Sequence, residues 1–184
     1  MINLEFKARL HDRPALLAVL QTLPATFAGV FRQCDTYFQV ASGRLKLREI
    51  TPLTPAEAAP AECQLIYYQR PDVAAVKRSD YALAPVHDAG RMKQVLRQAL
   101  GVRVVVVKRR ELYLLAMPGG GIRIHLDQVE GLGEFVEVEA VAGDASHAAR
   151  AEAEAHRLLH VFGVRRADLI SGSYADMLME SPCS

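Results

Sequence analysis

Charged side chains recur at every second position in several short apolar segments of this 184-residue chain. Successive side chains of a β-strand point to opposite faces, so each such segment would have one charged face and one apolar face. The alternating sets are Glu5, Lys7 and Arg9; Arg44, Lys46 and Arg48; Lys108 and Arg110; Arg123, His125 and Asp127; and Glu137 and Glu139. If these charged faces converge, they enclose a site for a highly charged ligand.

The charges are sorted by sign, with basic pairs on three segments and the carboxylate pair Glu137 and Glu139 alone on a fourth. An antiparallel sheet with one face in water would show the same alternation without any ligand. Solvated faces, however, usually mix both signs within a strand, because like charges on neighbouring strands repel each other. The sorting therefore favours a ligand that neutralises the clusters, such as phosphate groups with a divalent metal.

Four carboxylates are the candidate metal ligands, because hard divalent cations prefer carboxylate oxygens and Mg²⁺ commonly bridges them to substrate phosphates. They are Glu5, Asp127, Glu137 and Glu139. Carboxylates this crowded would raise at least one pKa among them unless a cation were present. The alternative is that each pairs with a lysine or arginine on a neighbouring strand.

Basic residues are the candidate phosphate ligands, because ammonium and guanidinium groups form charge-assisted hydrogen bonds with tetrahedral anions. The primary candidates are Lys7, Lys46, Arg48, Lys77, Lys108 and Arg110, and Arg44 and Arg123 are secondary candidates. Lys77 borders a loop, where a solvated lysine is the common alternative. Phosphoryl transfer depends mainly on positioning and on neutralising negative charge, which such a lining provides.

Composition narrows the class of protein and of partner. With 22 basic and 21 acidic residues the net charge is +1, so the chain lacks the field of a nucleic-acid-binding protein. No apolar run reaches membrane-spanning length, and the strand-like start predicts no secretion signal. The three cysteines show no CxxC spacing, which fits a reducing cytoplasm. We expect one domain, monomeric or homodimeric, that binds a small molecule and neither nucleic acid nor a membrane.

The elements that would position these residues are mostly strands. Strand-like segments are expected at 2–10, 29–40, 44–50, 63–69, 78–86, 102–110, 111–117, 122–128 and 134–141, and helices at 12–23, 87–100, 145–162 and within 166–179. The glycines of 118–121 lack the GK[ST] ending of a phosphate loop and predict a hairpin turn. The pattern predicts an α+β, mainly β fold of about eight antiparallel strands in a barrel or strongly curved sheet.

The ordered set of motifs resembles the CYTH superfamily, which includes class IV adenylyl cyclases and thiamine triphosphatases. The ExExK signature of that family corresponds to Asn3-Leu4-Glu5-Phe6-Lys7, with Asn3 in place of the first glutamate. The remaining motifs follow in order along nearly the whole chain: Asp35 to Phe38, Gly43 to Arg48, Lys77 to Tyr81, Lys108 to Arg110, Arg123 to Asp127 and Leu132 to Glu139. Residues 67–72, 77–81 and 172–174 are most similar to the class IV adenylyl cyclase-like branch.

This resemblance implies a single CYTH-like domain over residues 1–184, folded as an eight-stranded antiparallel β-barrel called the triphosphate tunnel. Such a barrel holds the polyphosphate of ATP, thiamine triphosphate or inorganic tripolyphosphate together with Mg²⁺ or Mn²⁺. In a cyclase the ribose 3′-hydroxyl attacks the α-phosphorus, whereas in a triphosphatase water attacks the terminal phosphorus. A noncatalytic nucleotide- or polyphosphate-binding module is the alternative.

Three residues are the catalytic candidates: Lys7, Tyr37 and Arg110. Tyr37 matches a tunnel tyrosine that works beside a lysine to activate water in the thiamine triphosphatase branch. The position of that lysine is Gln69 here, and Arg70 would replace it only if the strand register slips by one residue. Asn3 predicts a weaker or missing second metal site, because a neutral amide contributes less to a cation than a carboxylate does.

A helical metal motif is the remaining alternative. Glu152, His156 and His160 recur at helical spacing and could imitate an HxxxH metal face. Without a third strong ligand, we expect this set to be an exposed side of a helix.

Overall fold

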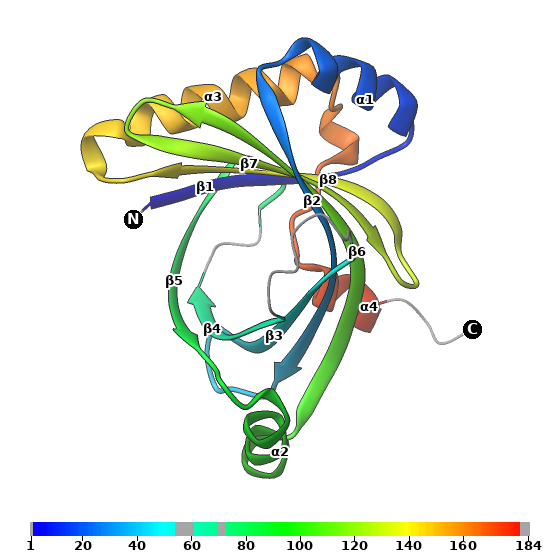
Figure 1. The fold of residues 1–184 in the computed structure, drawn as a ribbon, viewed down its shortest axis with the longest axis vertical. Coiled ribbons are helices and arrows are strands. Elements are labelled where there is room, and N and C mark those ends of the chain that lie inside the picture. Colours follow the sequence, from blue (N-terminus) through cyan, green and yellow to red (C-terminus); the bar gives the residue numbers. More distant parts are fainter. Residues whose placement is uncertain (1, 54–60, 70–72, 181–184) are drawn as a thin grey trace.

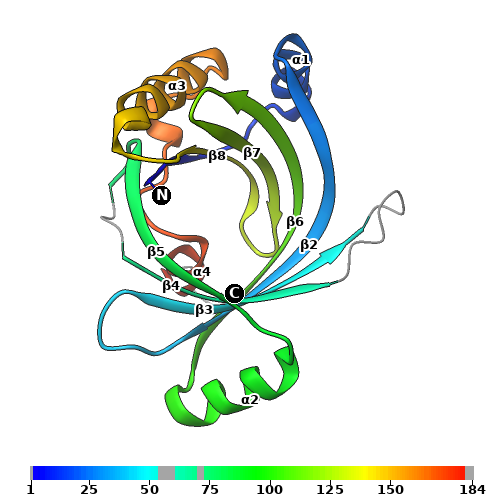
Figure 2. The ribbon, with the colours of Figure 1, turned by 60° about the vertical axis from the view of Figure 1, so that its left-hand side comes forward.

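The computed structural model describes residues 2–53, 61–69 and 73–180, without the side chains of residues 2 and 77–80. Eight antiparallel strands form a closed barrel in the order β1-β5-β4-β3-β2-β6-β7-β8 (Figure 1, Figure 2). The strands are β1 (Ile2–Arg9), β2 (Ala25–Phe38), β3 (Arg44–Pro52), β4 (Glu62–Gln69), β5 (Lys77–Pro85), β6 (Val102–Met117), β7 (Gly120–Val129) and β8 (Gly133–Ala142). The predicted mainly β, eight-stranded antiparallel barrel is confirmed.

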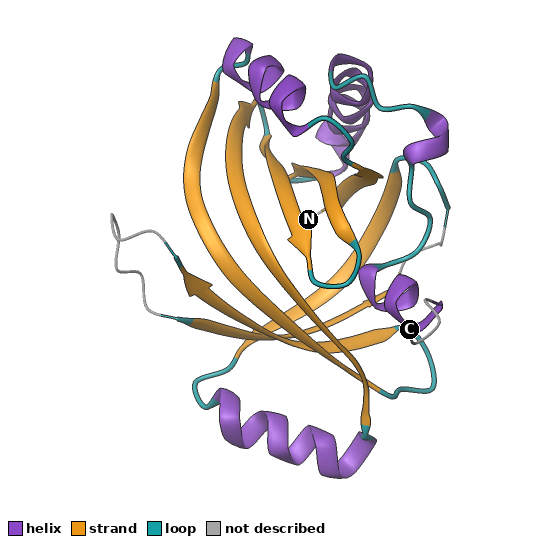
Figure 3. Ribbon diagram, turned by 90° about the vertical axis from the view of Figure 1, so that its right-hand side faces the viewer, coloured by secondary structure: helices purple, strands orange, loops and turns teal. Residues whose placement is uncertain are grey.

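Four α-helices lie around the barrel (Figure 1, Figure 3): α1 (Arg13–Thr22), α2 (Ala89–Leu100), α3 (Ala148–Val161) and α4 (Tyr174–Glu180). The Asp12 and Asp88 side chains accept hydrogen bonds from the backbone N–H groups of Ala15 and Arg91 and so cap α1 and α2. None of the helices in the described part of the chain is long and apolar enough to cross a membrane.

The barrel carries its main hydrophobic core on the outside. Phe6, Ile124 and Val138 of three neighbouring strands are fully buried and pack with Leu158 of α3 in one cluster, which also contains Leu20 of α1. Figure 1 shows α1 and α3 lying over this part of the barrel. Since the apolar side chains face outward to the helices, the alternate side chains face inward, and these are the charged ones.

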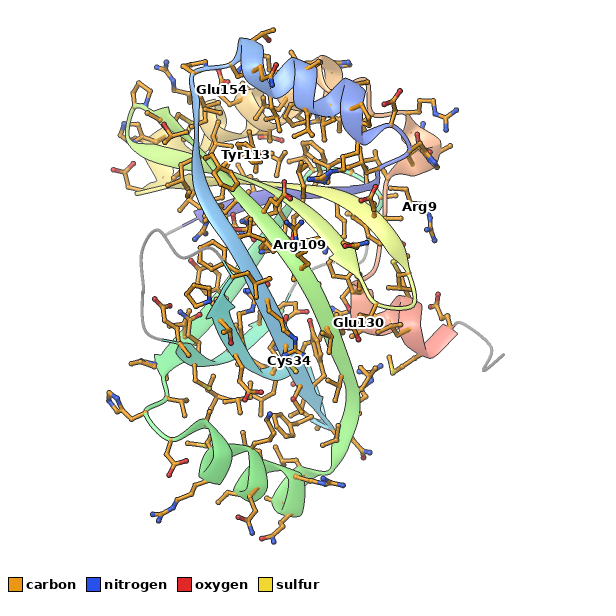
Figure 4. All side chains as sticks on the ribbon, turned by 45° about the vertical axis from the view of Figure 1, so that its right-hand side comes forward. Arg9, Cys34, Arg109, Tyr113, Glu130 and Glu154 are labelled. Carbon is orange, nitrogen blue, oxygen red and sulfur yellow. The ribbon has the colours of Figure 1, made fainter. Side chains whose placement is uncertain are left out.

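The prediction of separate strands at 102–110 and 111–117 is wrong. The two segments form one continuous strand, β6, which pairs along its length with β2 and β7. Its outward side chains change surroundings: Arg109 is solvent-exposed, whereas Leu115 and Met117 are buried in the cluster with α1 and α3. In Figure 4, Tyr113 lies nearer the helices than Arg109 does on the same strand. Because the outward side chains change from exposed to buried along one long strand, its residue pattern looks like that of two separate strands.

Glycines at 119 and 120 serve the β6–β7 hairpin, as the sequence predicts. Gly119 has φ +74°, a left-handed conformation that a residue with a Cβ rarely adopts. A Cβ on Gly120 would lie 1.9 Å from the carbonyl oxygen of Val141. Backbone conformation and close packing therefore explain these glycines without a phosphate.

Replacing Phe6 by alanine tests the outer core. The side chain is fully buried among β7, β8 and α3. We expect Phe6→Ala to lower the free energy of unfolding by about 3–5 kcal/mol, because it removes buried apolar area and leaves a cavity. Urea denaturation measures this loss. Phe27→Ala is the matched control, since Phe27 is 48% exposed and should cost much less; equal losses would show that this cluster is not the core.

Candidate active site

A cavity of about 460 Å³ occupies the interior of the barrel. Among the side chains that the structure describes, the charged lining residues are nearly balanced: six are basic (Lys7, Lys46, Arg48, Lys108, Arg110 and Arg123) and five are acidic (Glu5, Asp35, Glu62, Glu137 and Glu139). The antiparallel registers bring them together from distant parts of the chain, for example by placing Lys7 of β1 opposite Glu137 of β8. The predicted convergence of charged strand faces is therefore observed.

Asp35 organises one side of the cavity. Its carboxylate accepts two hydrogen bonds of 2.8 Å from the Arg48 guanidinium and one of 2.8 Å from Lys46 Nζ. Burial alone would raise the pKa of Asp35, but the two cations hold it well below the usual value. This carboxylate, which the sequence analysis did not single out, therefore fixes two candidate phosphate ligands in place.

Lys46 is a buried lysine whose amine can gain or lose its proton near neutral pH. Burial and the nearby Arg48 lower the pKa of Lys46 to about 7 despite its contact with Asp35. Its Nζ atom also lies 3.4 Å from the hydroxyl of Tyr37, which in turn lies 3.4 Å from the hydroxyl of Tyr68. Burial raises the pKa of Tyr37 well above its usual value, so Tyr37 offers a neutral hydroxyl and not a phenolate.

Asp127 lies behind the lining and not on it. Arg110 donates two hydrogen bonds of 2.7 Å to its two carboxylate oxygens, and Lys108 Nζ and the Tyr174 hydroxyl each donate one of 3.0 Å. Burial opposes ionisation, but Arg110 and Lys108 lower the pKa of Asp127 below its usual value. Because it accepts four hydrogen bonds and is not among the residues that line the cavity, we interpret Asp127 as an anchor for phosphate-binding side chains, and its role as a metal ligand stays a prediction.

Glu137 and Glu139 share the inner face of β8 with a histidine that faces them from β7. Glu137 forms ion pairs with Lys7 at 3.1 Å and with Arg110 at 2.5 Å. Glu139 forms an ion pair with Arg123 at 2.9 Å. Burial alone would raise the pKa of Glu137, but Lys7 and Arg110 hold it well below its usual value. Donor atoms of His125, Glu137 and Glu139 all lie within 4.8 Å of one another.

His125 is a site residue that the sequence analysis left without a role. Only the strand alternation of Arg123, His125 and Asp127 signalled that it shares a face with charged residues. Its side chain is buried, and burial together with Arg110 lowers its pKa, so the ring is neutral at pH 7. A neutral imidazole is the form that binds metals.

Asn3 and Glu5 lie on β1 next to this carboxylate pair, with Glu5 opposite Glu139. The Asn3 amide donates a 3.2 Å hydrogen bond to Glu5, while its carbonyl oxygen is buried and has no hydrogen-bond partner among the described residues. That oxygen is available to a cation or to a ligand donor, although it carries no charge.

Several predicted or considered residues lie elsewhere. Arg44 donates a 2.8 Å hydrogen bond to Asp176 of α4 and is not among the residues that line the cavity. The side chain of Lys77 and residue Arg70 lie outside what the structure describes. Gln69 is exposed and bonds to Tyr67. On α3, the side chains of Glu152, His156 and His160 are exposed, as expected for the outer side of a helix.

Part of the cavity lining is apolar, which the charge patterns did not reveal. This part includes Phe31, Ile50, Pro52, Leu83 and Leu112. The register of β2 and β3 places Phe31 opposite Pro52, then Gln33 opposite Ile50, and then Asp35 opposite Arg48. Along these two strands the lining thus changes from apolar to charged. At the boundary, the side-chain oxygen of Gln33 is buried without a hydrogen-bond partner among the described residues.

A family model described as the CYTH domain matches residues 1–174. The chain belongs to the CYTH family. Its predicted membership is thereby confirmed over nearly the full length. Among curated protein sequences, none matches the chain significantly.

Solved structures share the CYTH fold at low sequence identity. A putative adenylate cyclase from Vibrio parahaemolyticus has a TM-score of 0.76 at 19% identity, covering 97% of this chain and 98% of that chain. The PH1819 protein from Pyrococcus horikoshii has a TM-score of 0.75 at 22% identity, with the same coverage. The putative adenylyl cyclase HpAC1 from Hippeastrum, described as having a dominant triphosphatase activity, has a TM-score of 0.57 at 16% identity, covering 96% and 94%.

Tyr37 lines the cavity, whereas Gln69, at the position where the family resemblance predicts a partner lysine, is exposed. Lys46 of β3 places its amine 3.4 Å from the Tyr37 hydroxyl. A lysine and a tyrosine therefore meet in the cavity, and the catalytic role of Tyr37 stays a prediction.

The low pKa of Lys46 predicts that binding of a polyphosphate in this cavity would depend on pH. Above about pH 7 Lys46 is mostly neutral, so tripolyphosphate that contacts the charged amine would have to bind together with a proton. We expect metal-free affinity for tripolyphosphate to fall as pH rises from about 7 to 9, by at most about tenfold per pH unit for this one proton. Calorimetry in buffers of different ionisation enthalpy should detect the proton uptake. Lys46→Arg, which stays charged, should reduce the slope; the slope that remains is expected from Lys108, because burial and Arg110 lower its pKa to about 8. An unchanged slope would remove Lys46 from phosphate contact.

Removing the charge of Asp127 should weaken folding. Asp127→Asn removes the carboxylate that Lys108 and Arg110 share, which leaves Arg110 with Glu137 alone and the buried Lys108 without an ion pair among the described residues. We therefore expect a loss of about 3–5 kcal/mol in unfolding free energy, measured by urea denaturation. Asp88→Asn, at an exposed helix cap that asparagine also serves well, is the matched control. If both variants are equally stable and only Asp127→Asn loses its response to metal, Asp127 is a metal ligand and not an anchor.

Proposed function

We propose that this CYTH protein is a metal-dependent enzyme that binds an organic triphosphate in its barrel and hydrolyses the terminal phosphoanhydride bond. The observation that carries this proposal is the mixed lining of the cavity, which combines charged side chains from seven strands with a group of apolar side chains from β2, β3, β5 and β6. Triphosphate chemistry suits the charged side chains, and an organic group suits the apolar ones.

The charged side chains of the cavity are phosphate ligands that are already held in position. Arg110 and Lys108 are oriented by Asp127, and Arg48 and Lys46 by Asp35. Because these carboxylates fix the cations before a ligand arrives, the cations need little reorganisation when negative charge develops on the phosphoryl oxygens. Such preorganised neutralisation is the main requirement of phosphoryl transfer.

The near balance of charges supports a requirement for metal. The described lining holds almost as many carboxylates as basic side chains, so the several negative charges of a triphosphate would exceed the positive charge that these side chains supply. Glu137, Glu139 and His125 offer donor atoms close enough together to hold one divalent ion, and the buried Asn3 oxygen is nearby on β1. When bound there, Mg²⁺ or Mn²⁺ would neutralise phosphate charge and lower the pKa of a coordinated water.

Hydrolysis requires a water molecule aligned with the terminal phosphorus. Its oxygen forms the new P–O bond as the bond to the bridging oxygen breaks, giving orthophosphate and a diphosphate. Tyr37, whose hydroxyl lies between Lys46 and Tyr68, is the described residue best placed to orient such a water by hydrogen bonding. Its neutral hydroxyl positions water but does not act as a strong base. The triphosphatase activity stated for HpAC1 supports the same reaction class.

The apolar part of the lining supports an organic substrate over inorganic tripolyphosphate. Phe31 and Leu112 offer contact area that a bare polyphosphate could not use. Gln33, at the boundary, presents an unpartnered buried oxygen that would accept a hydrogen bond from a hydroxyl or amino group of the ligand. ATP and thiamine triphosphate both combine such groups with a triphosphate.

Product analysis tests this proposal. The protein is incubated with ATP, thiamine triphosphate or tripolyphosphate, each with Mg²⁺ and with Mn²⁺, and products are separated by chromatography. We expect orthophosphate and the organic diphosphate, with inorganic tripolyphosphate the poorer substrate. Cyclic AMP and pyrophosphate from ATP would establish a cyclase instead. Binding without product would make the protein a noncatalytic module, for which the neutral Asn3 would be the first explanation.

Carboxylate variants test the metal assignment. We expect Glu137→Gln with Glu139→Gln to abolish metal-dependent turnover, and Glu139→Gln alone to reduce it by roughly 10–100-fold. The single variant is the safer test of chemistry, because Glu139 pairs with an arginine whose side chain is 42% exposed, whereas Glu137 neutralises two buried cations. Glu152→Gln on the exposed side of α3 is the matched control. Full activity in the double variant would exclude this metal site.

A further inference from the structure

The nitrogen Nδ1 of His125 is buried without a hydrogen-bond partner among the described residues. The side chain is 4% exposed, and Oε2 of Glu137 lies 3.7 Å from Nδ1. That distance is too long for a hydrogen bond. A buried polar atom without a partner costs free energy, so an unsatisfied nitrogen that faces a cavity indicates a missing ligand.

The atoms around this nitrogen are suitable for a cation. His125 lies directly opposite Glu137 in the β7–β8 register, and Glu139 follows on the same face of β8. One donor atom from each of the three lies within 4.8 Å of the others. An ion about 2.0–2.2 Å from each donor requires them to lie within roughly 4.4 Å of one another, so small side-chain rotations would complete the site.

The two carboxylates are already engaged, but the imidazole is not. Lys7 and Arg110 contact different oxygens of Glu137, and Arg123 contacts Glu139. Each carboxylate oxygen has a second lone pair, so both glutamates can still bind a metal while they keep these contacts. The adjacent cations nevertheless repel a divalent ion, and this repulsion disfavours an ion that is held by electrostatic attraction to oxygen alone.

We propose that His125 is a metal ligand through Nδ1, and that this nitrogen makes the site selective for transition-metal dications such as Mn²⁺ and Co²⁺ over Mg²⁺. This inference deepens the proposed metal-dependent function and rests on it for its role in turnover. Mg²⁺ prefers a shell made entirely of oxygen, whereas imidazole nitrogen binds first-row transition metals well. The nitrogen therefore adds affinity for Mn²⁺ and Co²⁺ that Mg²⁺ would not gain.

Electron paramagnetic resonance of Mn²⁺ tests this inference on the full chain without substrate. Loss of the free Mn²⁺ signal gives the affinity, competition with Mg²⁺ gives the selectivity, and pulsed measurements detect coupling to a bound ¹⁴N nucleus. We expect the wild-type protein to bind Mn²⁺ with ¹⁴N coupling and at least roughly tenfold in preference to Mg²⁺.

His125→Asn is the informative variant, because it replaces the ring with a smaller group that offers an amide oxygen. We expect it to lose the ¹⁴N coupling, to weaken Mn²⁺ binding by at least roughly tenfold and to change Mg²⁺ binding little. His156→Asn, on the exposed side of α3, is the matched control and should leave all three unchanged. Thermal unfolding of each variant confirms that it is folded.

The failure of this inference is separable from failure of the proposed function. Absence of ¹⁴N coupling in the wild type, absence of Mn²⁺ binding, or equal losses of Mn²⁺ and Mg²⁺ affinity in His125→Asn would overturn the histidine ligand, even if triphosphates were hydrolysed. Coupling that depends on His125, in a protein that hydrolyses no triphosphate, would support the metal site while overturning the proposed reaction.

Discussion

The placement of ionised side chains inside a closed barrel constrains the rest of this structure. Removing a carboxylate or an ammonium group from water costs several kcal/mol, and the cost is offset only by close, well-oriented partners. Asp127 meets this condition with Arg110, Lys108 and Tyr174, and Asp35 with Arg48 and Lys46. The interior polar network and the outer apolar core therefore depend on one another, because the same alternation along each strand supplies both.

The internal ion pairs also relate stability to function. Until a polyanion enters, carboxylates neutralise the cations and keep the folded barrel stable. A bound triphosphate would share these cations with the carboxylates that hold them in place, so the same ion pairs that stabilise the barrel would also orient the phosphate ligands. Glu137 is the clearest case, because it contacts Lys7 and Arg110 and also lies beside His125.

Much of the fold and part of the site could be predicted from the sequence, because period-two alternation is a local signal. It placed Lys7, Lys46, Lys108 and Arg110 on inward faces, and all four line the cavity. It failed at β6, where the outer surroundings change from solvent to helix along one strand.

The parts of the site that were missed depend on contacts between strands. Lys46 reaches Tyr37 from β3, and the unpartnered nitrogen of His125 becomes apparent only once β7 lies beside β8. The apolar part of the cavity lining was also missed, because an inward-facing Phe31 or Ile50 cannot be distinguished by its residue type from an outward-facing core residue.

The pairing of β1 with β8 has a consequence for how the chain folds. These strands are separated by more than a hundred residues, yet their pairing closes the barrel and brings Lys7 beside Glu137. Contacts between such distant segments carry a large loop-closure entropy and form slowly. The last pairing to form is therefore expected to be the one that brings Glu5 and Lys7 of β1 beside Glu139 and Glu137 of β8. A chain that stalls before this closure would retain most of its secondary structure but would lack a competent site.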